Sequence, residues 1–191
     1  MNPEPDLLRG AHFHVLQQMS IVSEYFDEHK KLLLRENPGR NEAWLANEHM
    51  RKFNVWFQNR ISRSDTPTSE YLKKLAQGPI STVVTYQGYD INGYTFYTEQ
   101  QDKKSTYQNS CVRVDAYDVT GEDKSMYYGQ IQEIWELDYH QGFKIPLFRC
   151  NWVNAKKGVI KDKYGFISVD LNRHGYKLEP FVLAKHVSQV F

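Results

Sequence analysis

The chain has 191 residues, and its 24 Lys and Arg against 23 Asp and Glu give a net charge of +1. This balance argues against a strongly basic nucleic-acid platform and against an acidic tail. Cys111 and Cys150 form no CxxC pair, so we expect neither a disulfide framework nor a structural zinc site. With so few cysteines, we expect the protein to reside in a reducing compartment. The longest run without Asp, Glu, Lys or Arg, 75–89, is too short to span a membrane, and the N-terminal residues lack signal-peptide features.

The first part of the chain has helical periodicity. Apolar residues recur at three- and four-residue steps over 20–36, and Asn37-Pro38-Gly39 is a stop signal. A second helix is predicted over 41–61, with Trp56 and Phe57 in the core. A short third helix is expected to begin with Thr66 as its N-cap and Pro67 as its first residue, and to end before Gly78.

The second part of the chain changes period and contains 11 of the 13 tyrosines. Aromatic and β-branched residues favour strands, which we expect at 81–86, 112–117, 127–137, 143–153 and 164–171, with a last strand from Phe181. Residues 88–97 are expected to form a turn followed by a strand around 94–97. Short strands joined by polar turns, without long helices between them, predict an antiparallel barrel or curled sheet. The expected fold is therefore α+β, with a helical segment at 1–78 and a compact antiparallel β domain at 79–191.

Three groups of residues could carry chemistry, and for each a structural explanation is favoured. His12 and His14 form an H-x-H pair, but no Cys, Asp or Glu cluster completes a metal site, so a solvated pair is expected. Cys150 is expected to be buried and inert. The carboxylates of Glu133, Glu136 and Asp138 suggest a metal-dependent nuclease, but the polar face of a half-solvated strand explains them. We therefore expect no catalytic residues, no metal and no cofactor.

Two motifs concern nucleic acid. Residues 55–60, VWFQNR, match the core of a homeodomain recognition helix, but residues 62–65, SRSD, replace the expected basic run, so core packing of Trp56 and Phe57 is favoured. Four lysines are predicted around one turn beside Tyr164, where they could hold phosphates while a ring stacks, or protect a strand edge. These candidate nucleic-acid-binding residues are Lys156, Lys157, Lys161 and Lys163.

Several long motifs resemble plant CACTA (En/Spm-type) transposase-like proteins. The sequence GYDINGYTFYT at 88–98 is similar to a junction between two domains in that family. The domain that follows this junction in the family has no known function. Four further stretches of this chain resemble it: YYGQIQEIWELDY, FKIPLFRCNWV, DKYGFISVDLN and EPFVLAKHVSQVF. EYFDEHKKLLLRENPG and HMRKFNVWFQNRI are similar to the tail of the preceding domain. The resemblance implies that 1–78 is the tail of one transposon-associated domain and that 79–191 is a second one, cut short at its C-terminus. It supplies no catalytic or binding residues.

A second resemblance concerns residues 127–136 and the strand after them, which ends in Trp152. Together they are similar to the central hairpin of bromo-adjacent homology domains. The expected function is a non-enzymatic accessory region of a transposon-derived nuclear protein that binds DNA or a chromatin protein, without contact to membranes. The first alternative is a chromatin or peptide-binding module of the bromo-adjacent type, and the second is a degenerate fragment without independent function. The oligomeric state stays open.

Overall fold

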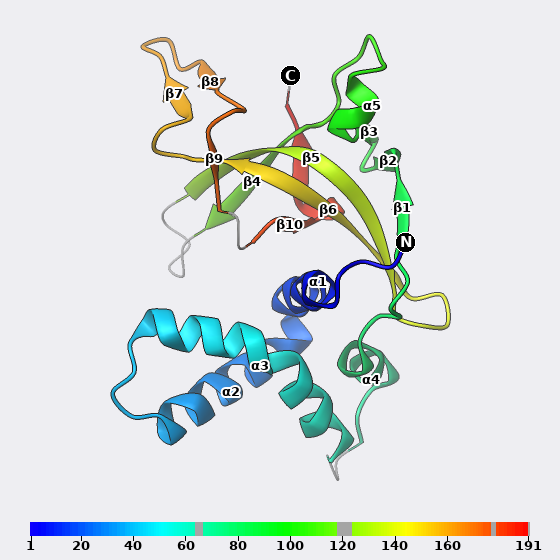
Figure 1. Cartoon of the computed structure of the whole chain (residues 1–191), viewed down its shortest axis with the longest axis vertical. Helices are drawn as coiled ribbons and strands as arrows, with labels where there is room; N and C mark the ends of the chain where they lie inside the picture. The colour runs from blue at the N-terminus through cyan, green and yellow to red at the C-terminus, as the bar shows by residue number, and fades with distance from the viewer. Residues whose placement is uncertain (64–66, 118–123, 177–178, 191) are drawn as a thin grey trace. The chain divides into compact units, whose positions relative to one another are not determined.

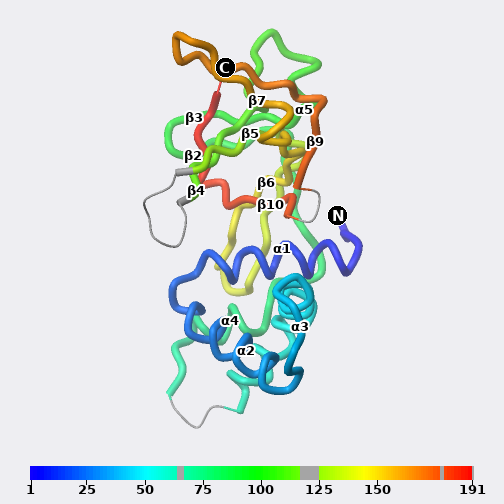
Figure 2. Tube along the Cα trace, turned by 90° about the vertical axis from the view of Figure 1, so that its left-hand side faces the viewer, coloured from blue at the N-terminus to red at the C-terminus, as the bar shows by residue number. Residues whose placement is uncertain are grey.

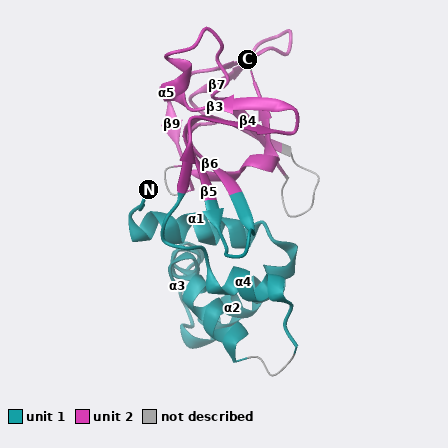
Figure 3. Cartoon of the chain, turned by 90° about the vertical axis from the view of Figure 1, so that its right-hand side faces the viewer, with its two compact units in different colours: residues 1–83, 137–145 teal, residues 84–136, 146–191 magenta. Residues whose placement is uncertain are grey.

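The computed structural model describes residues 1–63, 67–117, 124–176 and 179–190. The chain forms two compact units (Figure 3). The helical unit comprises Met1–Val83 and Leu137–Ile145, and the sheet unit comprises Val84–Glu136 and Pro146–Phe191. The chain therefore leaves the helical unit, builds part of the sheet, and returns for one short excursion before it completes the sheet.

The helical unit is built from five helical elements around an aromatic core. They are α1 (Pro5–Gln17), the 3-10 helix η1 (Ser20–Val22), α2 (Ser23–Glu36), α3 (Glu42–Ser62) and α4 (Glu70–Gln77) (Figure 1). The Phe26 and Phe53 rings lie 4.0 Å apart between their centroids, and the Phe53 and Phe57 rings are stacked at 5.5 Å. The predicted helices over 20–36 and 41–61 are confirmed, and α1 is an additional helix that the sequence did not predict.

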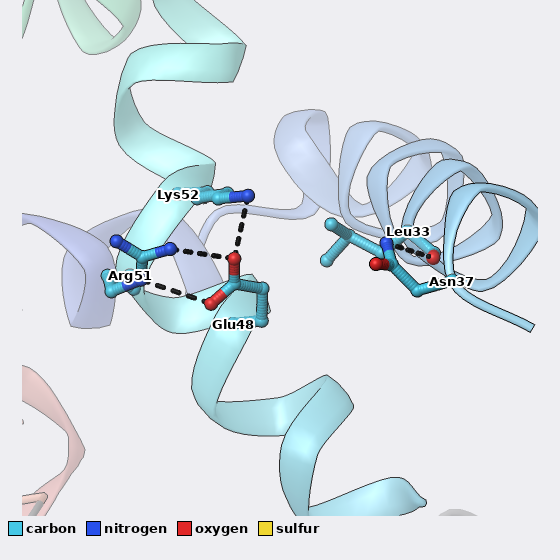
Figure 4. Close-up of polar contacts among 5 residues, drawn as sticks. All are labelled: Leu33, Asn37, Glu48, Arg51 and Lys52. Carbon is cyan, nitrogen blue, oxygen red and sulfur yellow. Dashed lines mark hydrogen bonds and ion pairs between the residues drawn. The ribbon is translucent and has the colours of Figure 1, made fainter. Parts of the chain in front are cut away.

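Local polar contacts fix where α2 ends and α3 begins. The Asn37 side-chain amide donates to the Leu33 carbonyl oxygen at 3.1 Å, and the Asn41 side chain accepts from the Trp44 backbone N–H at 2.8 Å. On α3 the Glu48 carboxylate pairs with Arg51 at 2.7 Å and with Lys52 at 2.6 Å, one helical turn away (Figure 4). Such exposed pairs add little stability, so the helices depend mainly on the aromatic core.

Two details of the helical prediction need correction. The helix α4 begins later than expected, because Ser69 is its N-cap and accepts from the Leu72 backbone N–H at 3.2 Å. The predicted cap at Thr66 lies outside the described residues. Trp56 is only half-buried, because it lies at the edge of the aromatic core against His29 and Phe53, whereas Phe57 is fully buried.

The sheet unit contains a seven-stranded antiparallel sheet. Its main path has the order β10-β6-β5-β4-β11, with β1 added to β5 and β9 added to β6. The strands are β1 (Val84–Tyr86), β4 (Cys111–Tyr117), β5 (Lys124–Asp138), β6 (Lys144–Val153), β9 (His174–Gly175), β10 (Phe181–Leu183) and β11 (Val187–Gln189). Only the 3-10 turn η2 (Ala184–His186) separates β10 from β11, although they lie at opposite ends of the path. The sheet must therefore curl strongly, and it forms the expected curled sheet rather than a closed barrel.

The core of the sheet unit lies inside this curl and includes Ile131, Ile134, Phe148, Cys150 and Trp152. Consecutive buried residues show that the central strands are covered on both faces. In β5, Ile134 belongs to this core while Trp135 packs against Phe181 at 5.2 Å.

The segment 88–97, predicted as a turn and one strand, is a hairpin of β2 (Gly88–Ile91) and β3 (Tyr94–Tyr97). Asn92 and Gly93 both have positive φ, as a two-residue hairpin turn requires. A short helix α5 (Glu99–Asp102) follows. Within the described part of the chain, no helix is long and apolar enough to cross a membrane.

Candidate nucleic-acid interface

A second hairpin, β7 (Val159–Lys161) with β8 (Ile167–Val169), carries most of the candidate site. It forms a two-stranded sheet of its own and leaves the seven-stranded sheet between β6 and β9 (Figure 1). Figure 2 shows the same hairpin from the side, in orange. The register pairs Lys161 with Ile167 and Ile160 with Ser168. Since directly opposed residues share a face, Lys161 and Ile167 point to one side of the hairpin and Ile160 and Ser168 to the other.

Asn154 builds the turn that enters the hairpin. Its side-chain oxygen accepts from the backbone N–H groups of Lys156 and Lys157, both at 3.1 Å, and its carbonyl oxygen accepts from Gly158 at 2.8 Å. A Cβ atom at Gly158 would lie 2.5 Å from the Val153 side chain, so the close approach requires glycine. The turn fixes the backbone of the first two lysines, and their side chains are exposed.

Asp162 builds the tip of the hairpin in the same way. One carboxylate oxygen accepts from the backbone N–H groups of Tyr164 at 2.8 Å and Phe166 at 2.9 Å, and Gly165 adopts a φ of +92°. The Lys163 ammonium lies 4.9 Å from the centre of the Tyr164 ring. The negative charge at the tip is thus used to hold the turn, which presents Lys163 and two aromatic rings to solvent.

The sequence predicted that the four candidate lysines lie around one turn, and this prediction is wrong. Lys156 and Lys157 precede β7, Lys161 ends it and Lys163 lies at the tip, because 159–161 is a strand rather than part of a loop. All four are exposed, and residues 154–174 contain five basic residues against two acidic ones in a chain of net charge +1. Tyr164 and Phe166 are 75% and 72% exposed, so the hairpin combines positive charge with accessible rings.

A cavity of about 450 Å³ lies between this hairpin and the seven-stranded sheet. Gly165, Phe166, Ile167 and Val169 line it from the hairpin side. From the sheet it is lined by Cys111 and Arg113 of β4, by Tyr128 and Gly129 of β5, and by Val190, with Leu171 beside them. The volume is in the range of small-molecule sites, roughly 300–1,000 Å³.

Arg113 is the one cation among the residues that line the cavity. Its Nε atom lies 3.1 Å from a carboxylate oxygen of Asp115, two residues further along β4, which holds the side chain in place. A guanidinium carries five donors and a flat face, so this ion pair leaves it able to contact a ligand in the cavity.

The two cysteines have different surroundings. Cys150 is buried in the sheet core, and burial raises its pKa, which fits the inert role predicted for it. Cys111 is half-buried on the cavity wall, and its pKa is raised by burial and by the nearby Asp102 carboxylate. Because the pKa of each thiol is raised, neither is activated as a nucleophile at neutral pH. The reactivity of Cys111 can nevertheless be used to probe the cavity, because this residue lies on its wall.

The predicted solvated pair of His12 and His14 is wrong for His12. Both histidines lie on the helix α1, where residues two apart point to different faces, and His12 is buried. Its Nδ1 atom is 2.9 Å from the Tyr139 hydroxyl oxygen, and burial lowers its pKa to about 4. Among the described residues no group of three His, Cys, Asp or Glu side chains could hold a metal ion.

The acidic residues of β5 have structural contacts. The Glu133 carboxylate accepts from Arg149 and, at 2.7 Å, from the Trp135 indole N–H. Glu136 accepts from the Tyr86 hydroxyl at 3.3 Å, and Asp138 accepts from the His140 backbone N–H at 2.7 Å. Each of the three carboxylates thus has a hydrogen-bond partner within the fold.

The homeodomain-like motif lies on α3. Its Asn59 side chain is exposed, while Arg60 pairs with the Glu28 carboxylate at 2.8 Å and Phe57 belongs to the helical core. The motif thus combines a core phenylalanine, an arginine in an ion pair and two exposed amides, those of Gln58 and Asn59.

Sequence reasoning found the lysines but missed Arg113, Tyr128 and Phe166 as a group. Arg113 occupies a regular polar position in the alternating strand Cys111–Tyr117, so the pattern does not single it out, and nothing in the sequence connects it with a hairpin tip far along the chain.

A family model described as a domain of unknown function (DUF4216) matches residues 135–191. The matched segment contains the end of β5, β6, the β7–β8 hairpin and the strands that follow. Neither a curated protein nor a solved structure matches the chain.

Proposed function

We propose that this chain is a non-enzymatic accessory region of a transposon-derived nuclear protein, and that it binds DNA through the β7–β8 hairpin. The observation that carries the proposal is that four exposed lysines and two exposed aromatic rings lie on one hairpin and the turn that enters it. Lysines neutralise phosphates and release counterions, while exposed rings stack on bases without regard to sequence.

The resemblance to CACTA transposase-like proteins supports a role beside DNA, and the DUF4216 match covers the entire hairpin. The description of that domain gives it no function, so the DNA contact depends on the charge and aromatic content of the hairpin itself. The hydrogen-bonded carboxylates of Glu133, Glu136 and Asp138 support an accessory rather than a catalytic role.

The alternative is a chromatin or peptide-binding module of the bromo-adjacent type. The charge of the hairpin disfavours lysine-rich chromatin peptides, because segment 154–174 has five basic residues against two acidic ones. An acidic peptide is the protein partner that this surface would suit best.

The test is a titration of a short oligonucleotide, both single-stranded and as a duplex, at several salt concentrations. The variant replaces Lys156, Lys157, Lys161 and Lys163 with Ala, and the matched control replaces the exposed Lys30, Lys31, Lys103 and Lys104, which removes the same charge elsewhere. With four phosphate contacts, the slope of log K against log salt for the duplex is expected to be about −3.6 in the wild type, at ~0.9 per contact.

The hairpin variant should bind at least about tenfold more weakly at low salt and with a smaller slope, while the control keeps most of the wild-type affinity. Little difference between different DNA sequences is expected, because nothing on the hairpin is arranged to read base edges. Equal losses in the two variants, or no binding by the wild type, would contradict the proposal and favour an acidic protein partner.

A further inference from the structure

We infer that the cavity between the β7–β8 hairpin and strands β4 and β5 is a binding site for one unpaired nucleobase of a single strand. This inference rests on the proposed function, because the lysines of the hairpin would hold the phosphates of that strand. Beyond that function, one base would occupy the cavity, and the protein would bind single strands in preference to duplexes.

The walls of the cavity suit a flat, largely apolar ring. Phe166 and Tyr128 supply aromatic surface, Ile167, Val169 and Val190 supply aliphatic surface, and the cavity measures about 450 Å³. A base offers two apolar faces and a polar edge, so it can bury its faces here while its edge meets the Arg113 guanidinium.

Cationic side chains lie on both sides of the cavity. Lys161 pairs directly with Ile167, which lines the cavity, so Lys161 is on the cavity side of the hairpin. Arg113, held by Asp115, supplies a cation on the opposite wall. A strand whose phosphates contact the lysines would therefore pass the mouth of the cavity.

The exposed rings extend this arrangement beyond the cavity. Phe166 lines the cavity and is nevertheless 72% exposed, and Tyr164, two residues away, is 75% exposed. These rings can stack on bases that neighbour the bound one, and base–ring stacking contributes about 1–3 kcal/mol per base. In a duplex the faces of the bases are covered by their neighbours, so only an unpaired strand can use both the cavity and these rings.

Cys111 provides a natural reporter, because it lies on the cavity wall and the second cysteine, Cys150, is buried in the core. The experiment measures the alkylation rate of Cys111 by mass spectrometry, at a fixed mildly alkaline pH, with and without a single-stranded oligonucleotide and with the matching duplex. The single strand should slow alkylation in proportion to the fraction of protein bound, and the duplex at the same occupancy should slow it less.

Two neighbouring substitutions test the cavity directly. Val169→Trp places a large ring in the cavity, while Ser168→Trp places the same ring on the opposite face of the hairpin. We expect Val169→Trp to weaken single-strand binding about tenfold, the value of losing one stacked base, and to slow Cys111 alkylation even without DNA. Ser168→Trp should leave both quantities close to those of the wild type.

The outcomes separate the two proposals. If single strands bind with the expected dependence on the four lysines but leave Cys111 equally reactive, or if Val169→Trp binds like Ser168→Trp, the cavity is not a base site and the proposed function stands. If no DNA binds at all, both proposals fail. If the duplex protects Cys111 as well as the single strand does, selection for an unpaired base is wrong.

Discussion

Phe57 and Trp56 are neighbours on α3 with different surroundings, and their substitution separates core packing from edge packing. Phe57 is fully buried, stacks on Phe53 and meets the Tyr25 ring edge-on at 5.1 Å. Phe57→Ala should lower the free energy of unfolding by about 3–5 kcal/mol, the cost of deleting a large core side chain. Trp56→Ala should cost clearly less, because the ring is half-exposed and loses fewer contacts.

Urea unfolding followed by circular dichroism at the helical wavelength measures both variants. An equal or larger loss for Trp56→Ala would show that the edge of the aromatic core contributes as much as its centre. Asn59→Ala is the control from the same helix, since its exposed side chain should change the free energy of unfolding very little.

The buried histidines make the stability of the helical unit depend on pH. Burial lowers the pKa of His12 from 6.5 to about 4, and burial with the nearby charges of His29 and Lys30 lowers that of His49 to about 3. The Nδ1 atoms of His29 and His49 are 2.7 Å apart. As pH falls below 6.5, the unfolded chain takes up protons that the folded chain does not, so the folded state loses stability.

For His12 this loss should occur between pH 6.5 and pH 4 and amount to about 3 kcal/mol, after which both states are protonated at that site. Unfolding in urea from pH 7.5 to pH 4.5 should show a shallower decline for His12→Gln than for the wild type. His174→Gln, at an exposed position, is the control and should follow the wild-type curve. A parallel decline in His12→Gln would mean that His12 titrates normally in the fold.

Within the regular elements, substitution of two glycines by alanine should have opposite effects on the free energy of unfolding. Gly10 lies inside α1, where an added Cβ would meet nothing within 4 Å, so Gly10→Ala should stabilise the chain by about 1 kcal/mol through helix propensity. Gly129 lies in β5, where a Cβ would come within 2.6 Å of the Trp152 ring. Because Trp152 is buried and its indole N–H donates to the Glu179 carbonyl at 2.9 Å, it has little room to move.

Gly129→Ala should therefore lower the free energy of unfolding by about 1–3 kcal/mol, the cost of overpacking a core. Thermal unfolding of the two variants beside the wild type tests the pair. A Gly129→Ala protein as stable as the wild type would show that β5 and β6 adjust to a methyl group at no cost.

At the scale of the whole molecule, the helical unit depends on a turn that lies far from it in the chain. Residues Leu137–Ile145 belong to this unit. Within it the Tyr139 hydroxyl contacts His12, the Phe143 ring lies 4.9 Å from that of Tyr71, and the Ile80 N–H donates to the Asp138 carbonyl at 2.9 Å. Tyr139 is fully buried.

A fragment of residues 1–83 lacks this turn, so it should unfold at a lower urea concentration than the helical signal of the whole chain. The whole chain with Tyr139→Phe is the matched comparison, because it keeps the ring and loses only the bond to His12. Its urea midpoint should lie between those of the fragment and of the wild-type chain. Identical midpoints for the fragment and the whole chain would show that the turn contributes no stability.

The features that depend on neighbouring residues could be predicted from the amino-acid sequence. Apolar spacing located α2 and α3, and aromatic and β-branched residues located β4, β5 and β6, because helix periodicity and strand propensity are local properties. The helix α1 was not predicted, because residues 5–17 were considered only for the His12-His14 pair, which was expected to be solvated. The strand β7 escaped it because three residues among lysines show no clear period.

Contacts between residues that are distant in the chain could not be predicted and are known from the fold. Cys111 and Arg113 on one strand, Tyr128 on the next and Phe166 on the hairpin tip line one cavity, and no spacing in the sequence relates them. His12 could be recognised as a core residue only once its partner Tyr139, far along the chain, was known. The physical reason is that burial and contact depend on how the strands pair and curl, which no local pattern of residues records.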